Sequence, residues 1–221
     1  MLQAAAVHDF APSRTAQIDP ADIASVVDAL NGPGWCVIPN YLQREVWQSL
    51  AADARDLHRR GQFRLARVGR KGESKVRPDV RTDRVCWIDP LETSLLQQDY
   101  LERADAMRQG INEKLTMGLF DFEGHYALYP PGCFYRRHLD RFADARHRTV
   151  SCIQYLNDKW RPGDGGDLRI YLPEAKTEEK YVDIQPIGGT AVFFLSGEFE
   201  HMVMPSTRER LSLTGWYCKR R

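Results

Sequence analysis

Three residues in the second half of the chain have the types and spacing of a metal site. His138 and Asp140 are two positions apart, and residues two apart on an extended strand point to the same face. His201 begins a later predicted strand. Two imidazoles and one carboxylate on one face of an iron(II) ion leave three coordination positions open for a cosubstrate and oxygen. We therefore predict that His138, Asp140 and His201 bind one metal ion.

An arginine and a tyrosine near this group could bind an acidic cosubstrate. Arg210 follows His201 by nine residues, and the strand period places Ser212 and Thr214 on the same face as Arg210. A fixed guanidinium binds the far carboxylate of a dicarboxylic acid through paired hydrogen bonds. Tyr155 could add a hydroxyl to the same carboxylate, although a tyrosine in such an apolar run is more often a core residue.

Hydrophobic periodicity predicts helices in the first half of the chain and strands in the second. Apolar residues recur every three or four positions over 20–30, 43–60 and 95–117, and a short strand is expected at 35–39. From His125 onward the period falls to two, with turn signals between the runs. Many short strands in such a segment favour a sandwich or barrel with the helices packed outside. The predicted strands are 125–129, 133–140, 149–157, 167–172, 181–187, 190–195, 201–205 and 210–218.

Composition excludes several classes of protein. The 221 residues carry a net charge of +1, which argues against a wholly basic nucleic-acid binder and an acidic disordered chain. No apolar run approaches the ~18 residues of a membrane span, and the first residues do not resemble a secretory signal. Five dispersed cysteines are typical of reduced thiols and predict a cytoplasmic protein. We expect an extension over 1–19 and one catalytic domain over 20–221, with helical support over 20–118 and a strand core over 125–218.

A strongly basic segment joins the two halves. Residues 59–84 contain ten Lys or Arg and three acidic residues. The stretch 69–75 is too polar for a core, so we predict an exposed loop between strands near 63–68 and 84–88. This loop is either a solvated hairpin tip or a mobile loop that grips an acidic or extended partner.

The chain resembles the iron(II)- and 2-oxoglutarate-dependent dioxygenases, and among them the prolyl hydroxylases that act on hypoxia-inducible factor and their bacterial homologues. The pattern of His138-x-Asp140, His201 and Arg210 carries the resemblance. The resemblance spans nearly everything from residue 20 to 218. Further matching stretches are 35–38, 57–63, 83–88, 129–132, 135–140, 152–157, 165–170 and 216–217.

The resemblance implies a fold, a set of cofactors and a set of site residues. The fold is mainly β with N-terminal helices (α+β), a jelly-roll or cupin-like double-stranded β-helix supported by about three helices. The metal is Fe(II), with 2-oxoglutarate and O2 as cosubstrates and ascorbate as a possible stimulant. The implied metal ligands are His138, Asp140 and His201. The implied 2-oxoglutarate residues are Arg210, Tyr155, Tyr129 and Thr214. The implied substrate contacts are Arg137, Trp216, Arg70, Lys75, Arg77 and Arg81, the last four in the basic loop, which matches a mobile loop of the family.

The activity implied by the resemblance is hydroxylation of a proline in an extended segment of a protein, with hydroxyproline, succinate and CO2 as products. We expect 4-hydroxylation. Elongation factor Tu is a candidate substrate by resemblance to the bacterial homologues, and we expect neither a membrane nor a nucleic acid as partner. No side chain is assigned as general base, because the cofactor carries the chemistry. The segment 129–138 is one residue shorter than in the animal enzymes, which affects the placement of Tyr129.

Two alternatives from other classes stay open. One is a 2-oxoglutarate oxygenase that acts on a small molecule or a nucleic acid, and a strong salt dependence of nucleic-acid binding would favour it. The other is a non-enzymatic barrel whose three candidate ligands hold zinc or no ion. We assign structural or surface roles to the cysteines and to the remaining histidines, His8, His58, His125 and His147. Arg146 and Arg148 flank His147, and like charges disfavour a metal ion there.

Overall fold

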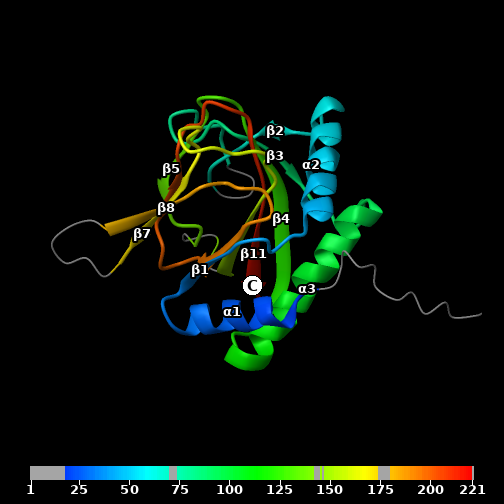
Figure 1. The fold of residues 1–221 in the computed structure, drawn as a ribbon, viewed down its shortest axis with the longest axis vertical. Helices are drawn as coiled ribbons and strands as arrows, with labels where there is room; N and C mark the ends of the chain where they lie inside the picture. Colours follow the sequence, from blue (N-terminus) through cyan, green and yellow to red (C-terminus); the bar gives the residue numbers. More distant parts are fainter. Residues whose placement is uncertain (1–17, 70–73, 142–144, 146, 174–179, 221) are drawn as a thin grey trace, which may run out of the picture.

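Two antiparallel sheets lie face to face, and helices cover the outer side of the larger sheet (Figure 1). The computed structural model describes residues 18–69, 74–141, 145, 147–173 and 180–220. The predictions for most of the N-terminal extension and for Arg70 lie outside these residues. Within the described ranges, no helix is both long enough and apolar enough to cross a membrane.

The helices begin and end where the sequence signals them. The Asp19 carboxylate accepts a hydrogen bond of 2.8 Å from the Ala21 amide and caps the first helix. Ser94 caps the third in the same way. Each helix turns its apolar face toward the larger sheet, where Leu50 and Met107 are completely buried. The helices are α1 (Pro20–Asn31), α2 (Arg44–Arg59) and α3 (Leu95–Leu115).

The larger sheet contains β1, β4 and β9, which contact the helices, and β11 and β4 form its longest pair. Its order among the described residues is β1-β9-β6-β11-β4-β3-β2. Its outer face packs on the helices and its inner face lines the space between the sheets. The strands are β1 (Trp35–Ile38), β2 (Arg64–Leu65), β3 (Arg84–Trp87), β4 (Leu119–Tyr129), β6 (Arg148–Tyr155), β9 (Ala191–Leu195) and β11 (Arg210–Lys219).

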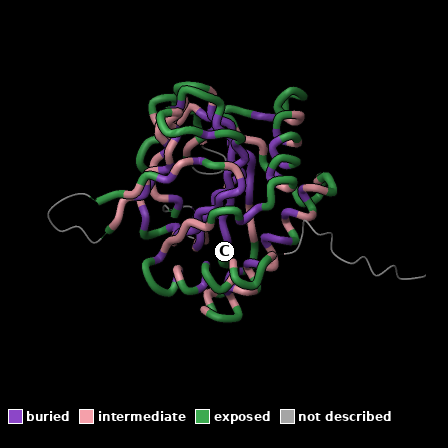
Figure 2. The backbone as a smooth tube through the Cα atoms, viewed as in Figure 1, coloured by how far each residue is buried: buried purple, intermediate pink, exposed green. Residues whose placement is uncertain are grey.

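The smaller sheet closes the other side of the core in the order β5-β10-β7-β8. In β7 the buried Leu168 and Ile170 alternate with the more exposed Arg169 and Tyr171, because one side of the strand faces the larger sheet. Figure 2 shows the buried chain concentrated at the centre of the molecule. The strands are β5 (Tyr135–His138), β7 (Leu168–Leu172), β8 (Lys180–Ile184) and β10 (His201–Val203). The predicted mainly β fold with helices is confirmed.

The predicted start of β4 and the predicted end of β5 are wrong. β4 begins at Leu119 instead of 125, because it pairs with nearly the whole of β11. Gly124 lies opposite Gly215 in this pair, and a Cβ at Gly215 would come within 2.3 Å of the Phe122 ring. The glycines make room for that ring and also hide the strand pattern. β5 ends at His138, so Asp140 lies in a bend beyond the strand rather than on it.

Asn157 ties the end of β6 to β11 and should be essential for stability. Its side chain accepts a hydrogen bond of 2.7 Å from the Leu211 amide and donates one of 2.8 Å to the Pro186 carbonyl. Asn157→Ala leaves two buried backbone groups unpaired, so the free energy of unfolding should fall by about 2–4 kcal/mol. Urea denaturation measures the change. The exposed neighbour Asp158→Ala is the control, and equal losses in both variants would contradict the assigned role.

Candidate active site

The three predicted metal ligands lie together, although they come from different segments. His138 is the last residue of β5, and His201, the first of β10, is its partner in the strand register. Asp140 lies between them, with one carboxylate oxygen 3.6 Å from His138 Nε2 and the other 3.6 Å from His201 Nε2. One ligand atom of each residue lies within 4.8 Å of the others. This spacing lets one ion contact all three side chains.

Neighbouring groups turn each ligand toward this common point. His138 Nδ1 lies 2.7 Å from the Arg136 carbonyl, and His201 Nδ1 lies 3.1 Å from the Phe199 carbonyl. A proton on each Nδ1 donates to that carbonyl and leaves the Nε2 lone pair for a metal ion. The donor set of two imidazoles and one carboxylate therefore fits iron(II).

Two residues that the sequence analysis missed support these ligands. The Ser151 hydroxyl donates a hydrogen bond of 2.7 Å to Asp140. The Tyr135 ring stacks on the His138 ring, with the centroids 3.6 Å apart. Tyr135 lies only three residues before His138 in β5, so its nearness to the candidate ligand was visible in the sequence. The Ser151 contact depends on tertiary structure and had no local signal.

The electrostatics of the group favour the charge states that bind a metal ion. Burial alone would raise the pKa of Asp140, but the facing histidines and Ser151 outweigh burial and hold the pKa far below its usual value. Burial and the nearby His138 lower the pKa of His201 to about 4. At neutral pH the carboxylate is therefore ionised and the His201 imidazole is neutral.

Arg210, the predicted binding residue for a carboxylate, is buried near the metal-ligand group. It is 1% exposed, and its Nε donates a hydrogen bond of 2.9 Å to the Gly166 carbonyl. Gly166 has a φ of +72°, and a Cβ there would lie 3.3 Å from Arg210 Cδ and 3.0 Å from Ser206 Cβ. A glycine at this turn therefore allows the backbone to approach the arginine closely.

The groups around Arg210 fit a carboxylate. The guanidinium carbon lies 5.1 Å from the ring centres of both Tyr129 and Tyr155. Arg210 Nη2 and the Tyr155 hydroxyl are buried and have no hydrogen-bond partner among the described residues. Buried donors without partners are costly, and one end of a dicarboxylate would satisfy both. Thr214 is close by, with its hydroxyl 3.4 Å from that of Ser212.

One cavity of about 750 Å³ connects the two groups. Its lining includes the three candidate metal ligands together with Arg210, Tyr129 and Thr214. Its volume is within the usual range for sites that bury small ligands. The cavity can therefore hold a small acid that contacts a metal ion at one end and Arg210 at the other.

The predicted substrate contacts divide into two groups. Trp216 and Arg81 line the cavity. Arg81 forms a buried ion pair with Asp83, and its guanidinium lies 4.0 Å from the Tyr135 ring centre. Arg137 points to the other side of β5, where it forms an ion pair with Glu200. The structure does not bring Arg137 to the cavity.

The described part of the basic loop lies near the cavity mouth. Val68 pairs with Lys75 in an antiparallel bridge, in the segment between β2 and β3. Val68 and Ser74 line the cavity, whereas Lys75 is outside its lining. Arg77 is exposed and forms an ion pair with Asp79. Any contact of Lys75 or Arg77 with a substrate would therefore lie outside the cavity.

Comparisons with known proteins agree with this geometry. Residues 124–218 match the model of the 2OG-Fe(II) oxygenase superfamily. A prolyl-4-hydroxylase structure from Pseudomonas putida is 43% identical, with a TM-score of 0.80 over 90% of this chain and 100% of that one. The chain belongs to the prolyl hydroxylase family of 2OG-Fe(II) oxygenases. The double-stranded β-helix and the family cofactors, Fe(II) and 2-oxoglutarate with O2, are thereby confirmed.

Other prolyl hydroxylases are similar to this chain at lower identity. Egl nine homolog 1 from Homo sapiens is 33% identical over 87% of this chain and 45% of the relative. The chain spans about half the length of the curated relatives that it matches first. A Trichoplax adhaerens prolyl hydroxylase, in complex with a peptide of the hypoxia inducible factor oxygen degradation domain, is 27% identical. Its TM-score is 0.80 over 90% of each chain.

The cavity-lining His125 should make the stability of the metal-free protein depend on pH. Its ring contacts those of Trp87 and Trp216, with the centroids 4.8 and 5.4 Å away, and burial, with the nearby arginines, lowers its pKa to about 3. The unfolded chain, with a histidine pKa near 6.5, binds this proton more readily. Stability should therefore fall as the pH drops from about 6.5 toward 3, by up to ~1.4 kcal/mol per pH unit.

His125→Phe should reduce this pH slope, because phenylalanine fits the aromatic site but does not titrate. Urea unfolding between pH 7.5 and 5 gives the slope for both proteins. The contribution of His201 to the pH dependence of stability should persist in the variant. An unchanged total slope would contradict the assignment to His125.

Proposed function

We propose that this protein is an iron(II)- and 2-oxoglutarate-dependent dioxygenase that hydroxylates a proline residue in a protein substrate. One observation carries the proposal. The His138, Asp140 and His201 group and a buried arginine with an unpartnered Nη2 open into one cavity. A non-enzymatic metal-binding barrel would not need a buried arginine at the other end of the cavity. The family membership supplies the substrate class.

In this proposal His138, Asp140 and His201 hold the iron through Nε2, a carboxylate oxygen and Nε2. Iron(II) with 2-oxoglutarate and oxygen supplies the oxidation that hydroxylates an unactivated C–H bond and yields succinate and CO2. The protein orients the ligands through the backbone contacts of the two Nδ1 atoms and through Ser151. No side chain needs to remove a proton from the substrate carbon, so we assign no general base.

Arg210 and Tyr155 bind the far carboxylate of 2-oxoglutarate in this proposal. Arg210 Nη2 and the Tyr155 hydroxyl are the donors, while Nε is already used by Gly166. A charge-assisted pair in a buried site is strong, and the fixed position of Arg210 selects a diacid of one length. Tyr129 and Thr214 complete this end of the cavity.

The substrate is proposed to be an extended protein segment that contains a proline. The mouth of the cavity has the half-exposed Trp87 beside Trp216, with the ring centres 6.2 Å apart. Flat aromatic surfaces suit the packing of a proline ring and an extended backbone. Elongation factor Tu is the candidate protein, carried by the resemblance to bacterial homologues.

The Asp140→Ala variant should lose turnover, because it removes the carboxylate ligand and leaves only the two imidazoles. Purified protein is incubated with iron(II), 2-oxoglutarate and a cell lysate freed of small molecules. Mass spectrometry then searches peptides for one added oxygen. Hydroxylated proline should appear with the natural protein and with Glu209→Ala, an exposed control, but not with Asp140→Ala.

Two outcomes of that experiment would overturn the proposal. Retained turnover in Asp140→Ala would contradict the ligand assignment. Consumption of 2-oxoglutarate without any protein-bound oxygen would move the substrate to a small molecule or a nucleic acid. A hydroxylated proline in elongation factor Tu would identify that protein as the substrate.

Arg210→Ala should mainly weaken binding of 2-oxoglutarate, because a charged hydrogen bond contributes about 1.5–3 kcal/mol. The apparent KM for 2-oxoglutarate should rise about tenfold or more in steady-state assays. Arg208→Ala is the control, since this exposed side chain pairs with Asp164 outside the cavity lining. An unchanged KM in Arg210→Ala would exclude the role.

A further inference from the structure

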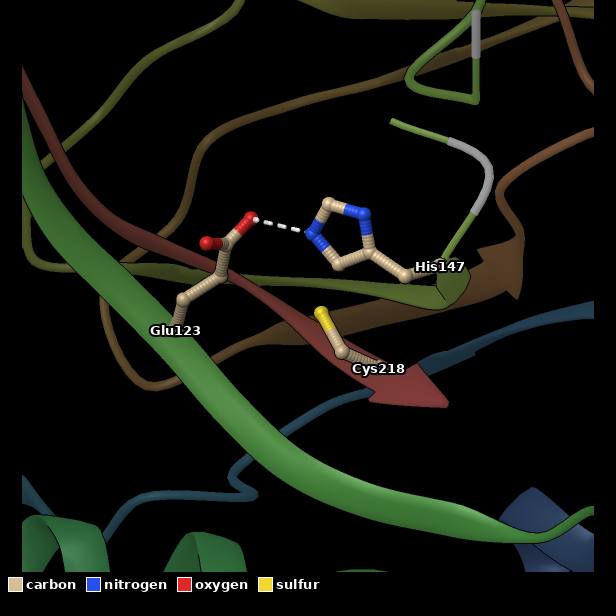
Figure 3. A group of neighbouring side chains, drawn as sticks. All are labelled: Glu123, His147 and Cys218. Carbon is tan, nitrogen blue, oxygen red and sulfur yellow. Dashed lines mark ion pairs between the residues drawn. The ribbon is translucent and has the colours of Figure 1, made fainter. Parts of the chain in front are cut away.

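A second group of metal-binding side chains lies beyond the candidate iron site. Glu123 of β4, His147 before β6 and Cys218 of β11 each place a ligand atom within 4.8 Å of the others (Figure 3). This group shares no residue with His138, Asp140 and His201. We propose that Glu123, His147 and Cys218 form a second metal site, for a zinc-like divalent ion.

Strand register brings the three side chains together. Glu123 pairs with Trp216 across β4 and β11, and Cys218 lies two residues beyond Trp216 on the same face. The Lys219 amide donates a hydrogen bond of 2.8 Å to the His147 carbonyl, which holds this segment against the end of β11. Because backbone hydrogen bonds fix all three positions, the group is largely preformed.

One of the three distances between ligand atoms is close to that in a tetrahedral zinc site, and the other two lie within 4.8 Å. Zn–S and Zn–N bonds of about 2.3 and 2.0 Å place ligand atoms about 3.3–3.6 Å apart. His147 Nε2 lies 3.8 Å from Glu123 Oε1 (Figure 3). Small side-chain rotations would therefore bring all three atoms within bonding distance of one ion.

The donor types select the ion. A thiolate, an imidazole and a carboxylate are the ligands of zinc and its neighbours, whereas magnesium and calcium prefer oxygen alone. A thiolate and a carboxylate balance the two positive charges of the ion, and the Cys218 thiol releases its proton on binding. Three protein ligands leave a fourth position for water.

Arg148 does not prevent Glu123 and His147 from binding a metal ion. Its Nε donates a hydrogen bond of 2.6 Å to Glu123 Oε1, and its guanidinium carbon lies 3.5 Å from the Trp216 ring centre. The arginine charge is thus paired with Glu123 and stacked on the Trp216 ring. A carboxylate accepts several partners, so Arg148 and a metal ion can share Glu123. The flanking charges that argued against His147 in the sequence are therefore not decisive.

The two ends of β11 serve different sites in this proposal. Arg210 and Cys218 are on the same strand face, and eight residues of antiparallel strand span about 27 Å. Glu123 and His147 line the cavity. An ion can therefore reach the second site from the cavity without passing through the pocket around Arg210.

Cobalt(II) absorption tests the proposal, because a cobalt–thiolate bond gives a strong near-ultraviolet band. The candidate iron ligands include no cysteine, so this band reports the second site alone. Protein loaded with iron(II) under nitrogen, with its thiols reduced, is titrated with cobalt(II) and then with zinc(II). We expect a band that saturates at one equivalent and disappears when zinc displaces cobalt.

Variants identify the ligands. Cys218→Ser should abolish the band, whereas Cys133→Ser, a cysteine outside the group, should retain it. Glu123→Gln and His147→Gln should each weaken zinc binding at least tenfold. These two variants also decide the matter if Cys218→Ser does not fold. No band in the natural protein, a band that persists in Cys218→Ser, or unchanged zinc affinity in both Gln variants would overturn the proposal.

Discussion

Asp140 holds an ionised carboxylate at a position that is only 5% exposed. A carboxylate removed from water costs several kcal/mol unless positive or hydrogen-bonding groups face it. Here the facing groups come from three strands, with His138 in β5, His201 in β10 and Ser151 in β6. β6 belongs to the larger sheet and the other two to the smaller one. The two sheets must therefore lie at one fixed separation for this charge to be accommodated, and a divalent ion held by the three side chains would complete the compensation.

Arg210 places a second, opposite charge at the other end of the same cavity. β11 lies between β6 and β4, which carry Tyr155 and Tyr129, so strand register alone sets the guanidinium between the two tyrosines. The helices pack on the outer face of this sheet. The distance between the metal ligands and Arg210 is thus a property of the whole fold. In the proposed function, that distance decides which dicarboxylate can span the site.

Period-two patterns located most strands, because one side of each faces the core between the sheets. They extended β5 too far, since a bend carries Asp140 to the ligand group where we expected a straight strand. The sequence singled out the three candidate metal ligands and Arg210, which the structure places around one cavity, but not the residues that support them. The Ser151 contact and the group of Glu123, His147 and Cys218 join residues that are distant in the chain. Such contacts follow from strand register and side-chain direction, which no local pattern encodes.

The central claim is that the candidate metal ligands and Arg210 form one site for iron(II) and 2-oxoglutarate. Anaerobic absorption spectroscopy tests it most directly, because it detects the binding of a 2-oxo acid to iron(II) without any protein substrate. Our account predicts a visible charge-transfer band that requires iron(II) and 2-oxoglutarate together. The band should vanish in Asp140→Ala, and Arg210→Ala should need much more 2-oxoglutarate to reach it. Absence of the band in the natural protein, or a band unaffected by both substitutions, would contradict the claim that these two buried charges define one site.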